Sequence, residues 1–360
     1  MIRSAKGKKV STRELLFDPR YYLFDTLPQR GQTRFLLTAE RTLAEEPFAD
    51  IRFEPLAIDS VTVATRELMR SFEQQDRPRP TTHYIFHHAF VCSTLLARCL
   101  NQSSAFFALK EPWILRRLAD IKRQHGNTIP ESHWRVMHST YFALLAKKYK
   151  SGRAVVVKAT NVANNLVADI VRYSPEQKIL YLYSDIESFL VSILKKPSST
   201  QEKMPGLLAG FLQDSDFAKH DNRLLSAGRL TLLQTCGLIW VCNIYSIKQA
   251  VEKGNYTGLR TLDMASLLSD PQVALRRVSG HFGHEPSAAD LALMTHADIM
   301  SRNAKDTAHQ YGPDLKEQER LQVYNSFRRD ITHALRWIES TVSDLGLYSF
   351  MRQLDVQIDD

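Results

Sequence analysis

The sequence lacks the features that build a membrane anchor, a disulfide framework or a metal site. No apolar run approaches the ~20 residues that cross a bilayer, and the basic start MIRSAKGKKV leads into no apolar segment of a secretory signal. CxxC spacing and a metal-ligand pattern with histidine are both absent from the four cysteines, Cys92, Cys99, Cys236 and Cys242. We therefore expect a reduced, cytoplasmic protein with no membrane span and no metal.

The nucleotide-binding pattern GxxxxGK[ST] is also absent, which weighs against an ATPase, a GTPase or a kinase-like phosphotransferase. The net charge is +8, yet the basic residues are scattered and form no RNA-binding signature. A phosphate-bearing small molecule or an acidic substrate explains this charge as well as nucleic acid does. The choice must come from the site.

What the sequence does contain is an alternation of strand and helix patterns that begins at residue 83. The chain has 360 residues, of which 44% are hydrophobic and 24% charged, so it can bury a large core. Amphipathic stretches follow the apolar runs HYIFHHAF, AFFALKEP, RAVVVKAT and KILYLYSD. This alternation predicts an α/β fold, a three-layer sandwich whose central parallel sheet is covered by helices on both faces.

Three regions are expected along the chain. Residues 1–80 are mixed in pattern and end in the connector EQQDRPRPTTHY, which contains two prolines. We predict that they form a helical extension packed on the core. Residues 81–330 are expected to form the α/β domain, and residues 331–360 a C-terminal helix and tail. The oligomeric state does not follow from the sequence.

Polar residues follow each apolar run, and in open parallel sheets ligands bind beyond the carboxyl ends of the strands. The candidates are residues 91–94, Lys110, Glu111, residues 158–161, Ser184 and Asp185. Because these strand ends are expected to meet at one edge of the sheet, their convergence carries more weight than any single residue.

The stretch FHHAFVCSTLLARCL, residues 86–100, has the layout of a phosphate-binding strand, turn and helix, without glycine or lysine in the turn. Ser93 and Thr94 would start the helix, whose free N–H groups and dipole attract anions. Ser93 also fits a plain N-cap, the interpretation that spacing alone favours. Cys92 could be reactive at a helix N-terminus, a minor hypothesis.

Two charges at strand ends have competing interpretations. Glu111 suits a general base acting on an acceptor hydroxyl, or a carboxylate favoured by the dipole of the helix WILRRL. Lys158 ends the apolar run AVVVK, where an ammonium needs an anion or solvent. It could contact a ligand, or it could form a structural ion pair with Glu111 or Asp185.

The remaining candidates are two histidines and two serines. His87 and His88 are consecutive in a strand, so they face opposite sides and cannot form a metal pair. One could act as an acid or base, but a hydrogen-bonded core histidine is favoured. Ser184 and Ser192 follow the run KILYLY, and a serine inside a helix usually faces solvent or bonds to the preceding turn.

The order of these pieces resembles the sulfotransferase family, whose members fold like nucleotide kinases and use 3′-phosphoadenosine-5′-phosphosulfate (PAPS) as donor. AFVCSTLL is similar to its phosphosulfate loop P-[RK]-S-G-T-T-x-L, and FFALKEPWILRRL to its segment with a catalytic glutamate. VVVKATNVANNL resembles the KTPxN stretch, and KILYLYSDIESFLVSIL the 3′-phosphate motif. LRTLDMASLLSDPQVALRRVSGHFG extends the resemblance, which covers about residues 83–320.

The resemblance implies a PAPS-dependent sulfotransferase whose acceptor is a hydroxyl or amine on a small molecule, a glycan or a peptide, with no nucleic acid partner. It implies that Glu111 takes the acceptor proton and that Lys158, His87 or His88 stabilises the leaving oxygen. The implied donor contacts are Cys92, Ser93, Thr94, Leu95, Ser184 and Ser192, with Arg302 and Lys305 from the later SRNAKD stretch.

Three positions depart from the family pattern. Phe90 stands where the loop has a basic residue, Cys92 where it has glycine, and Ser184 where an arginine grips the 3′-phosphate. We hypothesise that His87 or His88 replaces the loop charge. The alternative is a catalytically silent member of the fold that binds an anionic ligand or a protein partner.

Overall fold

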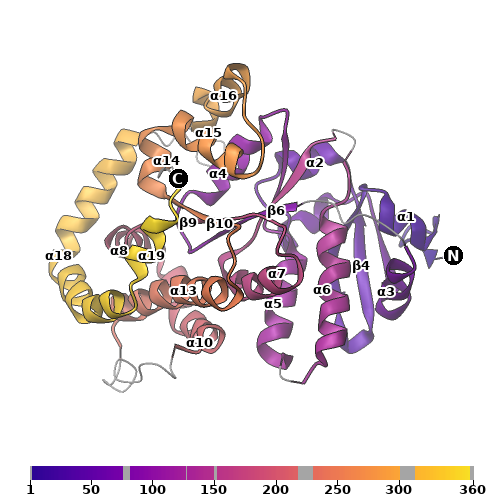
Figure 1. The fold of residues 1–360 in the computed structure, drawn as a ribbon, viewed down its shortest axis with the longest axis horizontal. Helices are drawn as coiled ribbons and strands as arrows, with labels where there is room; N and C mark the ends of the chain where they lie inside the picture. The colour runs from indigo at the N-terminus through magenta and orange to yellow at the C-terminus, as the bar shows by residue number, and fades with distance from the viewer. Residues whose placement is uncertain are drawn as a thin grey trace.

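The computed structural model describes residues 2–75, 82–126, 128–149, 152–217, 230–300 and 313–356. Its centre is a five-stranded sheet in the order β10–β9–β6–β8–β7, and every neighbouring pair is parallel (Figure 1). The strands are β6 (Thr82–His87), β7 (Phe106–Lys110), β8 (Ala154–Lys158), β9 (Ile179–Tyr183) and β10 (Leu259–Asp263). Among the described helices, none is long and apolar enough to cross a membrane.

The strands bury side chains on both faces, as a parallel sheet covered by helices requires. Tyr84, Phe86 and Val157 belong to one apolar cluster, whereas their neighbours Ile85 and Val156 belong to a second cluster on the other face. The alternation follows from the two-residue period of a strand. Two cores on opposite faces of one sheet confirm the predicted three-layer α/β sandwich.

Helices from distant parts of the sequence cover the two faces. The second cluster is enclosed by α4 (Ser93–Asn101), α14 (Met264–Ser269), α15 (Pro271–His281), α16 (Ala288–Met294) and α17 (Ala297–Met300). The first cluster is covered by α5 (Trp113–His125), α6 (Glu131–Leu145), η3 (Asn161–Leu166), α7 (Val167–Tyr173), α8 (Ile186–Leu194), α10 (Met204–Ser215) and α13 (Leu232–Gly254). The short α9 (Ser198–Gln201) follows α8.

The N-terminal region contains strands as well as helices, which corrects the expectation of a helical extension. An antiparallel sheet is formed by β3 (Tyr21–Leu27), β4 (Gln32–Leu37) and β5 (Asp59–Ala64), and a small ladder by β1 (Ile2–Arg3) and β2 (Lys9–Val10). The helical elements are α1 (Thr12–Phe17), η1 (Pro28–Arg30), α2 (Glu40–Glu45), η2 (Ile51–Leu56) and α3 (Thr65–Glu73). Because β3 is buried along nearly its whole length, it lacks the alternation that marks a half-buried strand.

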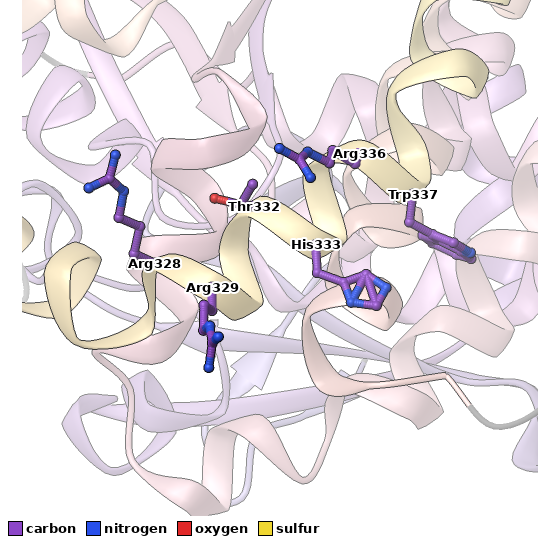
Figure 2. A pocket seen from close by; sticks show the side chains of 6 residues that line it. All are labelled: Arg328, Arg329, Thr332, His333, Arg336 and Trp337. Atoms are coloured by element: carbon purple, nitrogen blue, oxygen red, sulfur yellow. The ribbon is translucent and has the colours of Figure 1, made fainter.

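The C-terminal region is dominated by one long helix, α18 (Pro313–Asp344), which packs against α8 and α13. The expected boundary at residue 330 falls inside this helix. Phe327 interrupts it with non-helical backbone angles, and basic side chains project from the turns that follow (Figure 2). After α19 (Leu347–Gln353), Asp355 forms a parallel bridge with Thr261 of β10, so the chain end joins the sheet.

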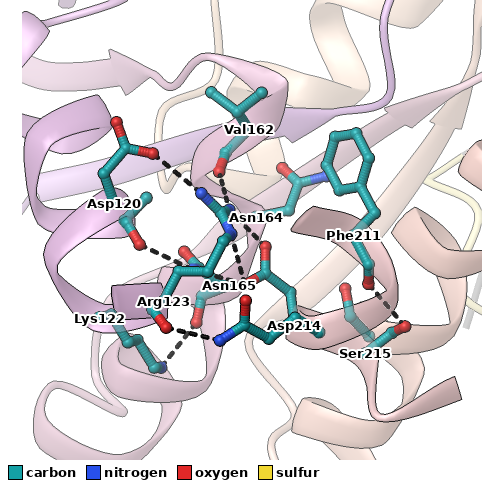
Figure 3. A network of polar contacts seen from close by, with 12 residues as sticks. Asp120, Lys122, Arg123, Val162, Asn164, Asn165, Phe211, Asp214 and Ser215 are labelled. Atoms are coloured by element: carbon teal, nitrogen blue, oxygen red, sulfur yellow. Dashed lines mark hydrogen bonds and ion pairs between the residues drawn. The ribbon is translucent and has the colours of Figure 1, made fainter. Parts of the chain in front are cut away.

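A polar network ties α5 to η3 and α10 beneath the first cluster (Figure 3). The guanidinium of Arg123 bonds Asp120 and Asp214 and donates to the Val162 carbonyl, 3.1 Å away. The amide of Asn165 donates to Asp214 from 3.0 Å. Because each charge in the network has hydrogen-bonding partners, these contacts offset the desolvation penalty of burying it, and the network fixes the helices relative to one another.

A buried lysine attaches the N-terminal sheet to the core. The Lys147 ammonium, just beyond α6, donates to the carbonyl oxygens of Leu15 and Tyr21 at 2.5 and 2.6 Å. The Leu15 carbonyl lies near the end of α1 and the Tyr21 carbonyl at the start of β3. Burial lowers the pKa of Lys147 to about 7, so its hydrogen bonds must offset a desolvation penalty.

Lys147→Met is expected to lower the free energy of unfolding by about 1–3 kcal/mol, because it leaves two buried carbonyl oxygens without a donor. Urea titration would measure the change. Lys148→Met is the matched control, because Lys148 is exposed, and it should change stability by less than about 0.5 kcal/mol. Equal effects of the two substitutions would contradict a structural role of the Lys147 ammonium.

Candidate functional site

Three of the predicted residues meet at the carboxyl edge of the sheet. Lys158 ends β8, the strand between β6 and β7, and its side chain is only 1% exposed. Its ammonium donates to the carboxylate of Glu111 and lies 3.4 Å from the hydroxyl of Thr94. The ion-pair interpretation of Lys158 is therefore confirmed with Glu111 as its partner, and the pair lies beside the start of α4.

The turns that carry this pair have unusual backbone. Phe90, Cys92 and Glu111 adopt positive φ values of 66°, 57° and 55°, although none is glycine. Such a conformation costs an L-residue on the order of 1 kcal/mol and persists where the surroundings enforce it. At Glu111, a 2.7 Å hydrogen bond from its own N–H to the Lys158 carbonyl helps to hold this backbone conformation. Cys92 thus has left-handed backbone at the position where the phosphosulfate-loop motif has glycine, the residue that adopts this conformation at the lowest steric cost.

The N-terminus of α4 differs from the expected plain cap. Cys92, not Ser93, is the N-cap residue, and within the described chain no side chain caps the helix. Ser93 and Thr94 are the first helical residues, where N–H groups have no acceptor within the helix. The Leu95 side chain is buried in the second cluster, so only its backbone could reach a ligand. Cys92 is half-buried, with no adjacent base evident among the described residues.

His87 and His88 are core residues whose rings bond backbone groups. The two ring nitrogens of His87 lie 2.7 and 3.0 Å from the carbonyl oxygens of His88 and Ala159. His88 Nε2 accepts from the N–H of Ser184 at 2.9 Å, which leaves Nδ1 to donate to the Ala89 carbonyl.

The same burial controls the charge of these rings. It lowers the pKa of His88 to about 4 and that of His87 well below its usual range. The His88 ring, which accepts a hydrogen bond at Nε2, is neutral and does not supply the missing loop charge.

A lysine from another element lies at the position where the loop charge is missing. The Lys196 ammonium, just beyond α8, is 5.0 Å from the centroid of the Phe90 ring. Phe90 stands where the phosphosulfate-loop motif has its basic residue. The positive charge of Lys196 therefore approaches this turn from a different part of the chain. In the sequence, Lys196 was simply the end of a helical pattern.

The end of β9 carries negative charge in place of an arginine. Ser184 is buried, and its hydroxyl donates to the Asp185 carbonyl at 3.2 Å. Asp185 caps α8 by accepting from the N–H and hydroxyl of Ser188. Burial, followed by the charges of Asp185 and Asp355, raises the pKa of nearby Asp263. Ser192 is half-buried inside α8.

Sequence reasoning missed a segment of the N-terminal region that borders Glu111. Ala49 bonds both sides of the Glu111 corner, donating to the Lys110 carbonyl at 2.6 Å and accepting from Trp113 N–H at 3.2 Å. Arg52 pairs with Asp50 and stacks 3.5 Å from the Phe48 ring centroid.

The charges of this segment interact with the ion pair. The hydrogen bond that the Arg52 guanidinium donates to Asp50 is the main cause that raises the pKa of Arg52, and the charge of Glu111 contributes. No pattern in the sequence marked this segment as part of the site, because its residues form no strand-helix unit.

The remaining candidates from the sequence are Lys110, Arg302 and Lys305. Lys110 does not face the site: its ammonium donates to the carbonyls of Ala44 and Leu43 at the end of α2, and burial lowers its pKa to about 7. Arg302 and Lys305 lie outside the described residues.

The buried histidines predict a stability that decreases in acid. Burial lowers the pKa of His83, His88 and His281 to about 4, against about 6.5 in an unfolded chain. Between these values the unfolded state binds more protons, so stability that is present above pH 6.5 is lost as the pH falls toward 4. Urea titrations should show a loss of roughly 2–3 kcal/mol per histidine between pH 7 and 4.5.

Two variants isolate the contribution of His88. His88→Gln should make the pH dependence shallower by about one such contribution, whereas His125→Gln, at an exposed position, should leave it unchanged. If His88→Gln showed the parent slope, His88 would have to carry its proton in the folded state.

Comparisons with known proteins give similarity to solved structures. No family model matches the chain, and no curated protein matches its sequence. A sulfotransferase domain from the curacin biosynthetic pathway is 12% identical, with a TM-score of 0.39 over 70% of this chain and 99% of that one. A sulfotransferase from Mycobacterium avium is 13% identical, with a TM-score of 0.36 over 73% of this chain and 81% of that one.

A third structure, a sulfotransferase from Alicyclobacillus acidocaldarius, is 13% identical, with a TM-score of 0.32 over 74% of this chain and 97% of that one. All three bear the name of the family that the order of the sequence motifs resembles.

Proposed function

We propose that this protein is a sulfotransferase that moves a sulfuryl group from PAPS to a hydroxyl or amine on a small molecule, a glycan or a peptide. The observation that carries the proposal is the buried pair of Lys158 and Glu111 beside Thr94, at the start of α4. A proton acceptor, a cation and a helix N-terminus at one sheet edge are the groups that sulfuryl transfer requires.

The 5′ end of such a donor fits the residues at this edge. The uncapped N-terminus of α4 favours an anion, and the Thr94 hydroxyl and Lys158 ammonium lie next to it. Lys196 adds a positive charge over Phe90. Together these groups would hold the phosphosulfate, with the helix N–H groups in place of the glycine-rich loop.

The chemistry divides between the two members of the ion pair. The acceptor oxygen or nitrogen bonds to sulfur, while the bond from sulfur to the bridging oxygen breaks and its electrons remain on the departing phosphate. Glu111 takes the proton that the acceptor loses, and the ammonium of Lys158 stabilises the bridging oxygen. Lys158 must turn from Glu111 toward the donor for this to occur, which also frees the carboxylate to act as base.

The 3′ end of the donor does not fit the described residues equally well. Serine cannot provide the bidentate guanidinium contact that suits phosphate, and Asp185 and Asp263 place carboxylates at this end of the edge. This observation favours a second candidate function, a catalytically silent protein of the same fold that binds a smaller anionic ligand or a protein partner.

Within the described part of the chain the four cysteines form no disulfide, which fits a reducing compartment. We accordingly propose a cytoplasmic location for the enzyme.

Glu111→Gln is expected to lower turnover at least a hundredfold, since removing a general base typically costs that much. The measurement is release of 3′-phosphoadenosine-5′-phosphate from PAPS in the presence of a panel of phenols, sugars and amines. Affinity for the released nucleotide should change by less than threefold. Turnover at the parental rate would remove Glu111 as the base.

Because Glu111→Gln leaves a buried ammonium without its counter-ion, a second variant controls for folding. Glu111→Gln combined with Lys158→Met removes both charges and should unfold close to the parent temperature. It should nevertheless remain inactive. Activity in this folded double variant would contradict both assigned roles.

Donor binding can be tested separately by calorimetry with 3′-phosphoadenosine-5′-phosphate. Thr94→Ala and Lys196→Gln should each weaken binding about three- to tenfold, because each removes one hydrogen bond or charge from the anion site. Lys203→Gln is the matched control, being an exposed lysine further along the same stretch, and should bind like the parent. No binding by the parent at high micromolar ligand would reject PAPS and favour the silent alternative.

A further inference from the structure

The middle of α18 carries a hollow that the strand-edge site does not use. Its volume is about 740 Å³. Of the described residues, those that line it are Arg328, Arg329, Thr332, His333, Arg336 and Trp337 (Figure 2). All lie within three turns of one helix, immediately after the interruption at Phe327.

The lining arginines differ from the cations earlier in the same helix. Arg320 pairs with Glu317 at 2.8 Å, and Lys195 of the α8 segment pairs with Glu319. Within the described chain, no carboxylate lies within ion-pair distance of Arg328, Arg329 or Arg336. Three exposed guanidinium groups on neighbouring turns repel one another, and a bound anion relieves that repulsion.

The spacing indicates a ligand with more than one anionic group. Arg328, Thr332 and Arg336 are four residues apart, and Figure 2 shows Arg328 and Arg336 projecting on the same side of the helix. Their Cα atoms are separated by eight residues, or about 12 Å along the helix axis. Two linked phosphate groups held between these long side chains can span that distance.

Trp337, the aromatic residue that lines the hollow, favours a ligand with a flat ring. Trp337 is half-buried and lines the hollow, and Figure 2 shows His333 and Trp337 next to each other along the helix. An indole offers a stacking surface for a nucleobase, worth about 1–3 kcal/mol per base in nucleic-acid-binding proteins. Guanidinium groups with an adjacent indole therefore match the two parts of a nucleotide.

The hollow is separate from the strand edge. In Figure 1, α8 lies between α18 and strand β9, and α18 packs against α8 and α13. A second hollow of about 540 Å³ shares Thr332 and Arg336 and extends to Asp185 and Ile186, where α8 begins. The two hollows therefore adjoin along α18, and Arg328 and Arg329 line the first hollow but not the second.

We propose that the Arg328–Arg336 segment of α18 is a binding site for a nucleoside polyphosphate, distinct from the strand-edge site. Arg328 and Arg336 hold the phosphate groups, and Trp337 stacks on the base. The inference goes beyond the proposed sulfuryl transfer and stands independently of it.

Calorimetry on the full-length chain with adenosine 5′-diphosphate (ADP) and with inorganic pyrophosphate tests the proposal. Both probes should bind saturably. Arg328→Gln combined with Arg336→Gln should weaken both at least tenfold, because two charge-assisted contacts are lost. Trp337→Leu should weaken ADP at least threefold and pyrophosphate less than twofold, since only the base stacks. Arg320→Gln, the paired arginine of the same helix, is the control and should stay within twofold of the parent.

Two comparisons separate this site from the strand edge and from other anions. Thr94→Ala combined with Lys196→Gln should retain the parental affinity for ADP, so a failure of the proposed sulfotransferase site would leave this result unchanged. If Trp337→Leu unfolds, Trp337→Phe replaces it in the test. This variant keeps a stacking ring and should retain most of the parental affinity for ADP. Absence of ADP binding would overturn the proposal, as would parental affinity in the double arginine variant. Arginine-dependent binding of only single-stranded DNA or of anionic vesicles would overturn it too.

Discussion

The buried ammonium of Lys158, at the end of a strand that is buried from Val155 onward, is the constraint on which the site depends. A charge in that position must be neutralised within reach of its side chain, because water does not reach it. Glu111 provides the counter-charge from the neighbouring strand end, at the cost of left-handed backbone. The same ammonium approaches the Thr94 hydroxyl, so one buried cation organises the ends of β7 and β8 and the start of α4.

Much of the sheet and half of the site follow from the sequence because their physical signals are local. Apolar runs followed by amphipathic stretches specify a parallel sheet, and the carboxyl-edge rule then places Thr94, Glu111 and Lys158 together. The N-terminal strands escaped prediction because β3 is buried throughout and shows no period. Lys196 and Arg52 escaped because their positions depend on how distant segments pack, which no sequence spacing encodes. The burial of His87 and His88 could not be derived from spacing either, since only the structure reveals how completely they are buried.

The two ends of the sheet edge carry charges of opposite sign. Near α4, positive charge comes from Lys158 and Lys196, and the helix dipole adds to it. At the ends of β9 and β10, Asp185 and Asp263 give the opposite sign. Negative charge is therefore concentrated at the ends of β9 and β10, while the described cations Arg336 and Arg320 lie near Asp185.

The two hydrogen bonds of Ala49 across the Glu111 corner limit how freely the N-terminal region of this chain can be exchanged. Because the N-terminal region bonds the backbone on either side of Glu111, it supports the position of this residue at the sheet edge. Exchanging it for the N-terminal region of another protein would change the alignment of Glu111 even if every residue at the sheet edge were kept. Variation in this region would therefore alter the surroundings of Glu111 while leaving the α/β core intact.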